Sequence, residues 1–308
     1  MTSTSRRVAA VVALVLTAAV WGSTFVMVKD AVAGYPLYAF LGWRFGVAVV
    51  AFLVMFPGTL KRFAPGTLRV GLAAGLLMCA GYVFQTWGLQ STSASKAAFI
   101  TGMFVVITPL LQAVILRRPP RAVTLAGVVM AVTGLWLLSG GNGGQWNVGD
   151  TRTLLAAFAY AAHMIVLGGP GRRHDPRALT LVQLTTIAVI CGGVSAVTEH
   201  PSLPSGTGLF VALAVTGVLA SAVAFAVQTT VQRFLSPTKT ALILILEPVF
   251  GGLFGWIAGE KLGSLALFGS GLILGGMLLA EVVGGSGTKP AEAAVGSAAV
   301  PVQEPESA

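Results

Sequence analysis

Residues 8–28, VAAVVALVLTAAVWGSTFVMV, form an uncharged and mostly apolar stretch. An α-helix rises 1.5 Å per residue, so about 20 such residues cross a hydrocarbon core about 30 Å thick. The preceding Arg6 and Arg7 also fit a secretory signal peptide, but the stretch is too long for one and has no small-x-small cleavage site before Trp21. We therefore predict a retained first transmembrane helix.

Nine further apolar stretches follow this one. They occupy residues 36–56, 70–89, 97–116, 121–139, 152–169, 177–197, 207–232, 240–258 and 262–283. Short connections rich in Gly and Pro separate them, and none is long enough to form a soluble domain. The sequence therefore predicts an all-α integral membrane protein with ten transmembrane helices.

The composition bears on several other classes of protein. Of the 308 residues, 55% are hydrophobic and 9% are charged, whereas a soluble domain has about 25% charged residues. The net charge of +9 does not indicate nucleic-acid binding, because the Lys and Arg residues lie in loops and form no basic helix face. Cys79 and Cys191 both fall in apolar stretches, so we expect no disulfide framework, metal site or cofactor.

The distribution of positive charge predicts the orientation in the membrane. With the N-terminus inside, 14 Lys and Arg residues fall on the cytoplasmic side, 4 fall outside, and Arg44 lies within a helix. The cytoplasmic residues are Arg6, Arg7, Lys61, Arg62, Arg69, Arg117, Arg118, Arg121, Arg172, Arg173, Arg177, Arg233, Lys239 and Lys289. The outer residues are Lys29, Lys96, Arg152 and Lys261. Because positive residues are retained in the cytoplasm, this asymmetry predicts a plasma-membrane protein with both termini cytoplasmic.

The two halves of the chain are weakly similar at an offset of 142 or 143 residues. The matching positions are Gln85-Thr86 with Gln228-Thr229, Lys96 with Lys239, and Leu125, Gly127 and Gly134 with Leu267, Gly269 and Gly276. If each half holds five helices, an odd number, the second half must enter the membrane from the opposite side. Two inverted five-helix repeats are typical of secondary transporters that bind their solute near the membrane midplane.

The sequence therefore divides into five parts. They are a cytoplasmic N-terminus at 1–7, a first five-helix repeat at 8–139, an outer connecting loop at 140–151, a second five-helix repeat at 152–283 and a tail at 284–308. The tail is rich in Gly, Ala, Pro and Glu, and we expect it to be disordered and cytoplasmic.

Three segments resemble the EamA domains of the drug/metabolite transporter superfamily. They are WGSTFVMVKDA at 21–31, the pair Arg44-Phe45, and LILEPVFGGLFGWIAGEKLG at 244–263, and the resemblance extends over about residues 8–283. It implies a ten-helix exporter of amino acids, metabolites or drugs. In the first half, LRRPP at 116–120 replaces the acidic G-E ending that many relatives carry, so no role is transferred to Arg117 or Arg118.

Two charged residues lie inside predicted helices. Glu247 is about 10 Å from the cytoplasmic surface and Arg44 is about 12 Å from the outer surface, so their heights differ by about 8 Å. An intramembrane acid costs several kcal/mol unless it is paired, hydrated or protonated, which makes Glu247 a candidate proton carrier. Alternatively, Glu247 is a structural acid, and depth permits a pair with Arg44. Arg44 can instead bind a substrate carboxylate through two parallel hydrogen bonds.

Aromatic and amide side chains inside the helices are candidates for the solute path. Trp21, Trp43 and Tyr82 lie deep enough to form a cavity wall, whereas the other tryptophans lie near helix ends. Gln85 and Gln228 occupy the third and eighth predicted helices. Each can contact a solute or join two helices by a hydrogen bond.

A histidine and two prolines complete the candidates. His163, close to Tyr160 in the sixth helix, can relay protons or stack with an aromatic ligand, or it can be a hydrogen-bonded core residue. Pro109 and Pro248 each remove a backbone hydrogen bond within an apolar segment. Interrupted helices at corresponding places in two repeats indicate a transporter site, although a simple packing kink explains the prolines equally well.

These observations favour a secondary-active exporter of small metabolites, amino acids or drugs, with protons as the counter-ion. The chain contains no ATP-binding segment, so a gradient must supply the energy. An importer or passive facilitator of the same fold is the alternative, and a non-transporting membrane scaffold or sensor is a weaker one. An intramembrane enzyme is disfavoured because the sequence has no HExxH, GxSxG or clustered Asp motif. The expected partners are a small solute and the bilayer, and the sequence does not indicate an oligomeric state.

Overall fold

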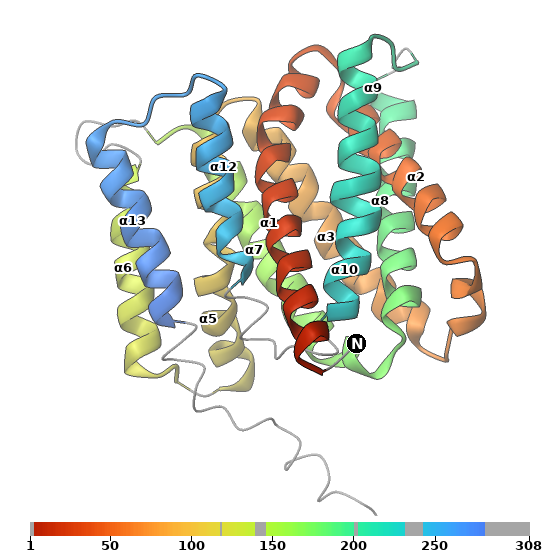
Figure 1. Ribbon diagram of the computed structural model, residues 1–308, viewed down its shortest axis with the longest axis horizontal. Helices are drawn as coiled ribbons and strands as arrows, with labels where there is room; N and C mark the ends of the chain where they lie inside the picture. The colour runs from red at the N-terminus through yellow and green to blue at the C-terminus, as the bar shows by residue number, and fades with distance from the viewer. Residues whose placement is uncertain (1–2, 118, 139–145, 200–202, 232–242, 281–308) are drawn as a thin grey trace, which may run out of the picture.

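The computed structural model describes residues 3–117, 119–138, 146–199, 203–231 and 243–280, and the elements in these ranges are all helical (Figure 1). The first half contains α1 (Ser3–Gly34), α2 (Leu37–Met55), η1 (Pro57–Arg62), α3 (Thr67–Leu89), α4 (Ala94–Gly102), α5 (Phe104–Leu116) and α6 (Ala122–Leu138). The second half contains α7 (Val148–Gly168), η3 (Pro170–Arg173), α8 (Pro176–Thr198), α9 (Thr207–Ala214), η4 (Val215–Val223), α10 (Ala224–Val231), α12 (Leu246–Ile257) and α13 (Ser264–Leu278).

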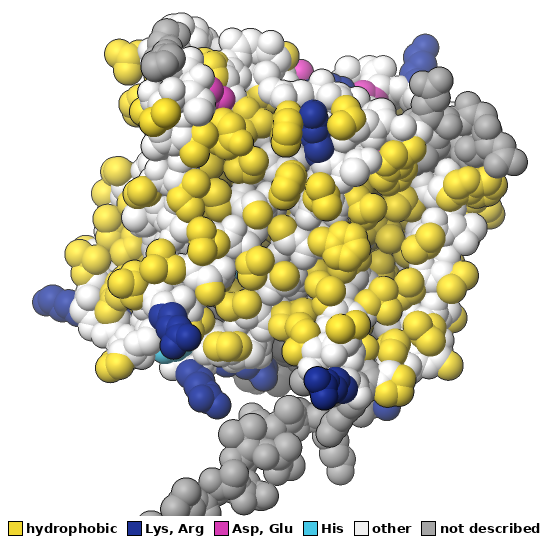
Figure 2. Space-filling view, turned by 180° about the vertical axis from the view of Figure 1, so that it is seen from behind, with side chains coloured by type: hydrophobic (Ala, Val, Ile, Leu, Met, Phe, Trp, Pro, Cys, Tyr) yellow, Lys and Arg dark blue, Asp and Glu magenta, His cyan; other side chains and the backbone are white. Residues whose placement is uncertain are grey.

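The described helices have the lengths and surfaces of membrane-spanning segments. Seven helical runs are long and apolar enough to cross a bilayer, and α6, α12 and α13 are shorter apolar helices. Large aliphatic side chains face outward, since Val54, Val114 and Val197 are each at least 75% exposed. Figure 2 shows hydrophobic side chains over the middle of one face and Lys and Arg side chains mainly along its lower edge. The chain is therefore a multi-pass membrane protein.

Polar caps explain why some helices begin earlier than hydropathy predicts. Helix α7 starts at Val148, four residues before the predicted boundary at 152, because Asn147 and Asp150 form a capping box. The Asn147 side chain accepts a hydrogen bond from the Asp150 N–H, and the Asp150 carboxylate accepts one from the Asn147 N–H. The Ser93 hydroxyl caps α4 in the same manner by accepting from the Lys96 N–H.

Two helices are interrupted at corresponding positions of the halves. A turn at Met103 separates α4 from α5, and a turn at Ile245 precedes α12. The backbone angles φ and ψ are −56° and −19° at Met103, and −57° and −21° at Ile245. These positions are 142 residues apart. Pro248, three residues after the second turn, lacks the N–H that would bond Leu244 and so favours the turn. Pro109, a candidate for a helix break or a packing kink, lies inside α5, and the turn follows Gly102 instead.

Helices α6 and α13 pack closely through the glycines of the repeated L-x-G-x6-G pattern. A Cβ atom on Gly134 would lie 2.5 Å from the Gly269 carbonyl oxygen, and one on Gly269 would lie 2.5 Å from the Gly134 oxygen. Gly127 and Gly276 approach each other in the same reciprocal way, at 2.6 and 2.5 Å. The two helices are antiparallel, so Gly127 contacts Gly276 and Gly134 contacts Gly269. In the repeat, Gly127 matches Gly269 and Gly134 matches Gly276 at an offset of 142, so each glycine contacts the match of the other glycine on its own helix.

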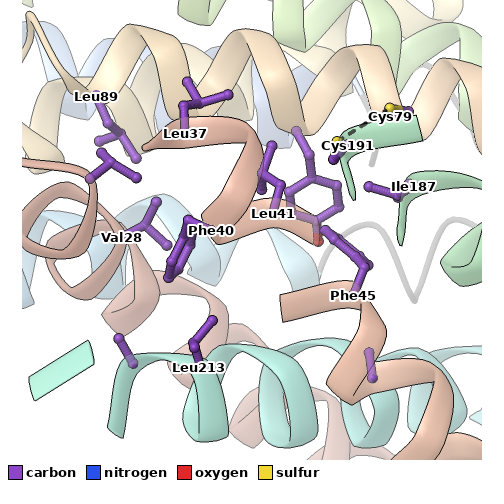
Figure 3. Packing of buried hydrophobic residues seen from close by; sticks show 14 of the residues in the cluster. Val28, Leu37, Phe40, Leu41, Phe45, Cys79, Leu89, Ile187, Cys191 and Leu213 are labelled. Atoms are coloured by element: carbon purple, nitrogen blue, oxygen red, sulfur yellow. Dashed lines mark hydrogen bonds between the residues drawn. The ribbon is translucent and has the colours of Figure 1, made fainter. Parts of the chain in front are cut away.

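The largest buried cluster joins both halves around α2, α3 and α8. Phe40, Phe45 and Ile187 are fully buried in it (Figure 3). Cys79 on α3 and Cys191 on α8 are free thiols whose sulfur atoms lie 3.9 Å apart. The sequence placed both cysteines in apolar helices but gave no sign that they meet.

The two ends of the described chain lie at the same end of the bundle. The N-terminal end of α1 and the C-terminal end of α13 are both at the bottom of Figure 1. The predicted tail at 284–308 and the matched residue Lys239 lie outside the described residues.

Replacing Gly134 with Ala tests the α6–α13 contact. Because the added Cβ meets a backbone oxygen that cannot rotate away, we expect Gly134→Ala to destabilise the protein by about 1–3 kcal/mol. Thermal unfolding of the purified protein in one detergent measures this. Gly271→Ala on α13 is the matched control, since its Cβ meets no atom within 4 Å, and it should be neutral or stabilise by up to about 1 kcal/mol. Equal midpoints for the two variants would contradict the contact.

Candidate functional site

A cavity lies among α1, α2, α3, α4, α5, α7, α10 and α12. Its volume is about 90 Å³, which is enough for several water molecules. Its wall includes all eight residues that the sequence suggested for binding or coupling: Trp21, Arg44, Tyr82, Gln85, Tyr160, His163, Gln228 and Glu247. Residues from both halves of the chain therefore converge on one site.

Arg44 is held in the cavity wall by an aromatic ring and a hydroxyl group. Its guanidinium carbon lies 4.7 Å from the centre of the Tyr82 ring and 5.2 Å from that of Phe45. Its Nε donates a hydrogen bond to the Ser221 hydroxyl at 3.2 Å. The residue is only 2% exposed. A buried cation is thus fixed by neutral groups.

Glu247 faces the same cavity from the first turn of α12. The ion pairs within 4.0 Å among the described residues are Lys29–Glu260, Arg62–Asp175 and Lys96–Asp150, so Glu247 takes part in none. The ion pair between Arg44 and Glu247 that helical depth permitted is therefore not formed, although both side chains line one cavity. Helical depth could not decide this, because it fixes height and leaves lateral position open.

Three polar side chains of the wall, Gln85, Thr101 and Tyr160, are joined by hydrogen bonds. The Gln85 amide donates to the Thr101 hydroxyl at 3.1 Å, and the Tyr160 hydroxyl donates to the Gln85 oxygen at 3.4 Å. The Tyr160 ring also packs edge-on against Tyr82, with ring centres 5.7 Å apart. Gln85 therefore joins α3 to α4 and α7 while it lines the cavity. Gln228 contributes a second amide from α10.

His163 and Trp21 are both anchored by hydrogen bonds. His163 Nε2 lies 2.6 Å from the Gln183 side-chain oxygen, and the Gln183 amide donates to the Leu179 carbonyl. Because that oxygen can only accept, His163 is the donor at Nε2, which fits a hydrogen-bonded core histidine better than a proton relay. Trp21 donates from Nε1 to the Ala220 carbonyl at 2.7 Å.

Trp43 does not line the cavity. It is 43% exposed and borders a shallow groove between α2 and α8 on the outside of the bundle. Successive residues of a helix point about 100° apart, so a helix that turns Arg44 inward turns Trp43 away. The expectation that Trp43 forms a cavity wall is wrong for this reason.

Sequence reasoning missed three aromatic residues of the wall, Phe25, Phe104 and Phe225. Phe225 lies 143 residues after Tyr82, as Gln228 lies 143 after Gln85, and all four line the cavity. The repeat offset could have identified Phe225. Phe104, which follows the turn at Met103, had no comparable signal. Ser221, which orients Arg44, was also missed.

Glu260 ties together the ends of three cavity helices. It follows α12, accepts hydrogen bonds from the Ala94 and Ser95 N–H groups at the start of α4, and pairs with Lys29 of α1 at 3.3 Å. Burial alone would raise the pKa of this carboxyl, but the Ser95 and Ala94 donors and the Lys29 ammonium lower it below its ordinary value. Glu260 is the acid of the G-E-K-L segment, whose role the sequence left undefined.

A bundle of apolar helices around a cavity with charged and aromatic walls is the architecture of a membrane transporter. The sequence profile of the EamA-like transporter family matches twice, at residues 8–140 and 147–281. The chain therefore belongs to the EamA-like transporter family, which confirms the resemblance seen in the sequence.

Curated relatives extend over most of this chain. An uncharacterized transporter of Archaeoglobus fulgidus is 32% identical over 87% of this chain and 84% of its own length. A probable terminal-alkyne amino-acid exporter of Streptantibioticus cattleyicolor is 28% identical over 88% and 92%. An S-adenosylmethionine/S-adenosylhomocysteine transporter of Chlamydia trachomatis is 26% identical over 88% of each chain. The names of these relatives are those of transporters and not of enzymes.

A solved crystal structure has the same fold. It superposes on 90% of this chain and 98% of its own with a TM-score of 0.65 and 16% sequence identity. This likeness concerns the fold alone.

Removing the Glu260 carboxylate should destabilise the protein in a pH-dependent manner. Because the folded-state pKa lies below the unfolded value of about 4.3, the stabilisation is complete above that value and is lost as the pH falls through the folded-state pKa. We expect Glu260→Gln to cost about 1–3 kcal/mol at neutral pH and to match the wild type at the acid end. Unfolding midpoints measured from pH 7 to pH 3 in detergent test this.

Lys29→Met provides a graded comparison. The Lys29 side chain is 37% exposed, so its removal should cost less than that of Glu260. A Glu260→Gln deficit that stays constant across the pH range would show that the charge of Glu260 is not what stabilises this end of the bundle.

Proposed function

We propose that the chain is a secondary-active transporter that exports a small zwitterion, such as an amino acid, in exchange for protons. The observation that carries this proposal is that Arg44 and Glu247 line one cavity without pairing with each other or with another charged residue among those described. Two opposite charges kept apart in a membrane interior are costly, and a solute that carries both complementary charges offsets that cost.

The walls of the cavity suit the three parts of such a solute. Arg44 offers hydrogen-bond donors to a carboxylate, and Glu247 offers acceptors to an ammonium group. Trp21, Tyr82 and Phe225 provide aromatic surface for an apolar side chain. The names of two relatives, an amino-acid exporter and an S-adenosylmethionine/S-adenosylhomocysteine transporter, support solutes with an amino-acid group.

Competition at Glu247 provides a means of coupling. A carboxylate can bind a proton or a solute ammonium, and binding one removes the charge that attracts the other. A proton that enters from outside therefore favours release of the solute there, and loss of that proton to the cytoplasm restores the acceptor. The same scheme run with a different gradient gives import.

The internal repeat supports alternating access. We infer ten crossings arranged as two inverted repeats of five, because the family profile matches twice, the turns at Met103 and Ile245 correspond, and the glycines of α6 and α13 exchange reciprocally. A cavity where two inverted halves meet can open to either side when one half tilts against the other. The charge distribution favours cytoplasmic termini in the plasma membrane.

Replacing Glu247 tests proton coupling. In proteoliposomes loaded with an identified substrate, we expect Glu247→Gln to abolish transport driven by a pH gradient, a loss of at least about 100-fold, because an amide cannot carry the proton. Exchange of labelled for unlabelled substrate without a gradient should persist at a reduced rate. A screen of overexpressing cells for efflux of amino acids and their analogues supplies the substrate.

Asp30→Asn is the matched control, since Asp30 is an exposed carboxylate at the outer end of α1. It should transport as the wild type does. Accumulation that is unchanged when the pH gradient is collapsed would exclude the proton-coupled mechanism and leave a facilitator.

The inverted topology predicts that the two ends of the chain lie on one side of the membrane. Reporter tags that are active only in the cytoplasm, placed before Ser3 and after Ala308, should both be active in whole cells. A tag inserted between α1 and α2, after Gly34, should be inactive there. Terminal tags on opposite sides would exclude an even number of crossings.

A further inference from the structure

The eighth span contains a π-helical segment that holds two residues of the cavity wall. This segment, η4, covers Val215–Val223 between α9 and α10. In a π-helix each N–H bonds the carbonyl five residues earlier, and such segments often occur at functional sites. Trp21 and Arg44, from α1 and α2, both form hydrogen bonds to η4.

Both acceptors lie in the π-helical segment. The Ala224 N–H bonds the carbonyls of Leu219, five residues earlier, and Ser221, whereas the Ala220 carbonyl accepts from Trp21. The Ser221 hydroxyl donates to the Thr216 carbonyl, also five residues earlier, at 2.8 Å. With its one proton used there, the Ser221 oxygen presents its lone pairs to Arg44 Nε.

These contacts fix the orientation of the Arg44 guanidinium. Its Nε is engaged by Ser221, and its face lies over the Tyr82 ring. Among the described residues no other hydrogen bond reaches the guanidinium, so the two terminal nitrogens keep their donors. The edge formed by these nitrogens offers two parallel N–H groups, the arrangement that a carboxylate binds end-on through both oxygens.

We propose that Ser221, presented by the π-helical segment, is a positioning residue that aligns Arg44 for end-on binding of a carboxylate and so sets the preference for carboxylates over amides. This inference rests on the proposed function, which assigns Arg44 to the carboxylate. It adds Ser221, which is neither of the two charged residues of the cavity, as a determinant of the preference for carboxylates. Ser221 is fully buried and acts through Arg44, without contact to the solute being required.

The test measures the dissociation constants of matched probes on the full-length protein in detergent. The probes are L-leucine, L-methionine and L-phenylalanine, each paired with its amide, which has the same side chain and ammonium but no carboxylate. We expect the wild type to prefer at least one amino acid over its amide by about tenfold or more. Ser221→Ala should weaken binding of that amino acid about tenfold, as expected for a lost hydrogen bond to a charged group, and change amide binding less than about twofold.

Two further variants separate positioning from folding. Ser221→Thr keeps the hydroxyl and should restore the preference. Ser270→Ala is the matched control, because Ser270 is a buried helical serine of α13 that bonds the Ala266 carbonyl away from the cavity, and it should bind all probes as the wild type does. Equal weakening of acid and amide by Ser221→Ala, or a lowered unfolding midpoint with an unchanged preference, would overturn the inference.

Arg44→Met distinguishes failure of this inference from failure of the proposed function. If Arg44→Met abolishes the preference and Ser221→Ala does not, the positioning role alone is wrong. If Arg44→Met keeps the preference, or the wild type binds none of the three amino acids, the assignment of the carboxylate to Arg44 is wrong and the role of Ser221 with it.

Discussion

A guanidinium buried within the membrane without a carboxylate beside it is the constraint on which the site depends. Arg44 is held by the Tyr82 ring and the Ser221 hydroxyl, and the ion pairs among the described residues do not include it. Neutral partners lower the cost of burial and leave the charge available. The Glu247 carboxyl group lines the same cavity and takes part in no ion pair among the described residues. The site therefore has a polarity that internal pairing would have cancelled.

Much of the bundle could be predicted from the sequence because hydrocarbon imposes a strong and simple pattern. Apolar stretches gave the helices, and the rarity of polar side chains within them singled out residues such as Gln85 and Glu247 that the structure places on one cavity. Lateral neighbours could not be predicted, since every helix face is apolar enough to face lipid. This is why an Arg44–Glu247 pair and a cavity position for Trp43 were considered and are not found.

Local backbone detail was also beyond the sequence. Nothing in VTGVLASAV at 215–223 distinguishes a π-helix from an α-helix, and the residues that bond to this segment come from α1 and α2, which are distant in the chain. The turn at Met103 follows Gly102 where Pro109 was the more visible signal. By contrast, the repeat offset was informative: it relates Tyr82 and Gln85 to Phe225 and Gln228. Applied to Tyr82, the same offset could have identified Phe225 as a cavity residue.

The sulfur contact between Cys79 and Cys191 joins a helix of the first half to a helix of the second. The rocking of one half against the other that we propose would change the separation of these atoms. Both thiols are buried in this structure, so their reaction with a thiol reagent would report an opening of the contact between the halves without any introduced residue.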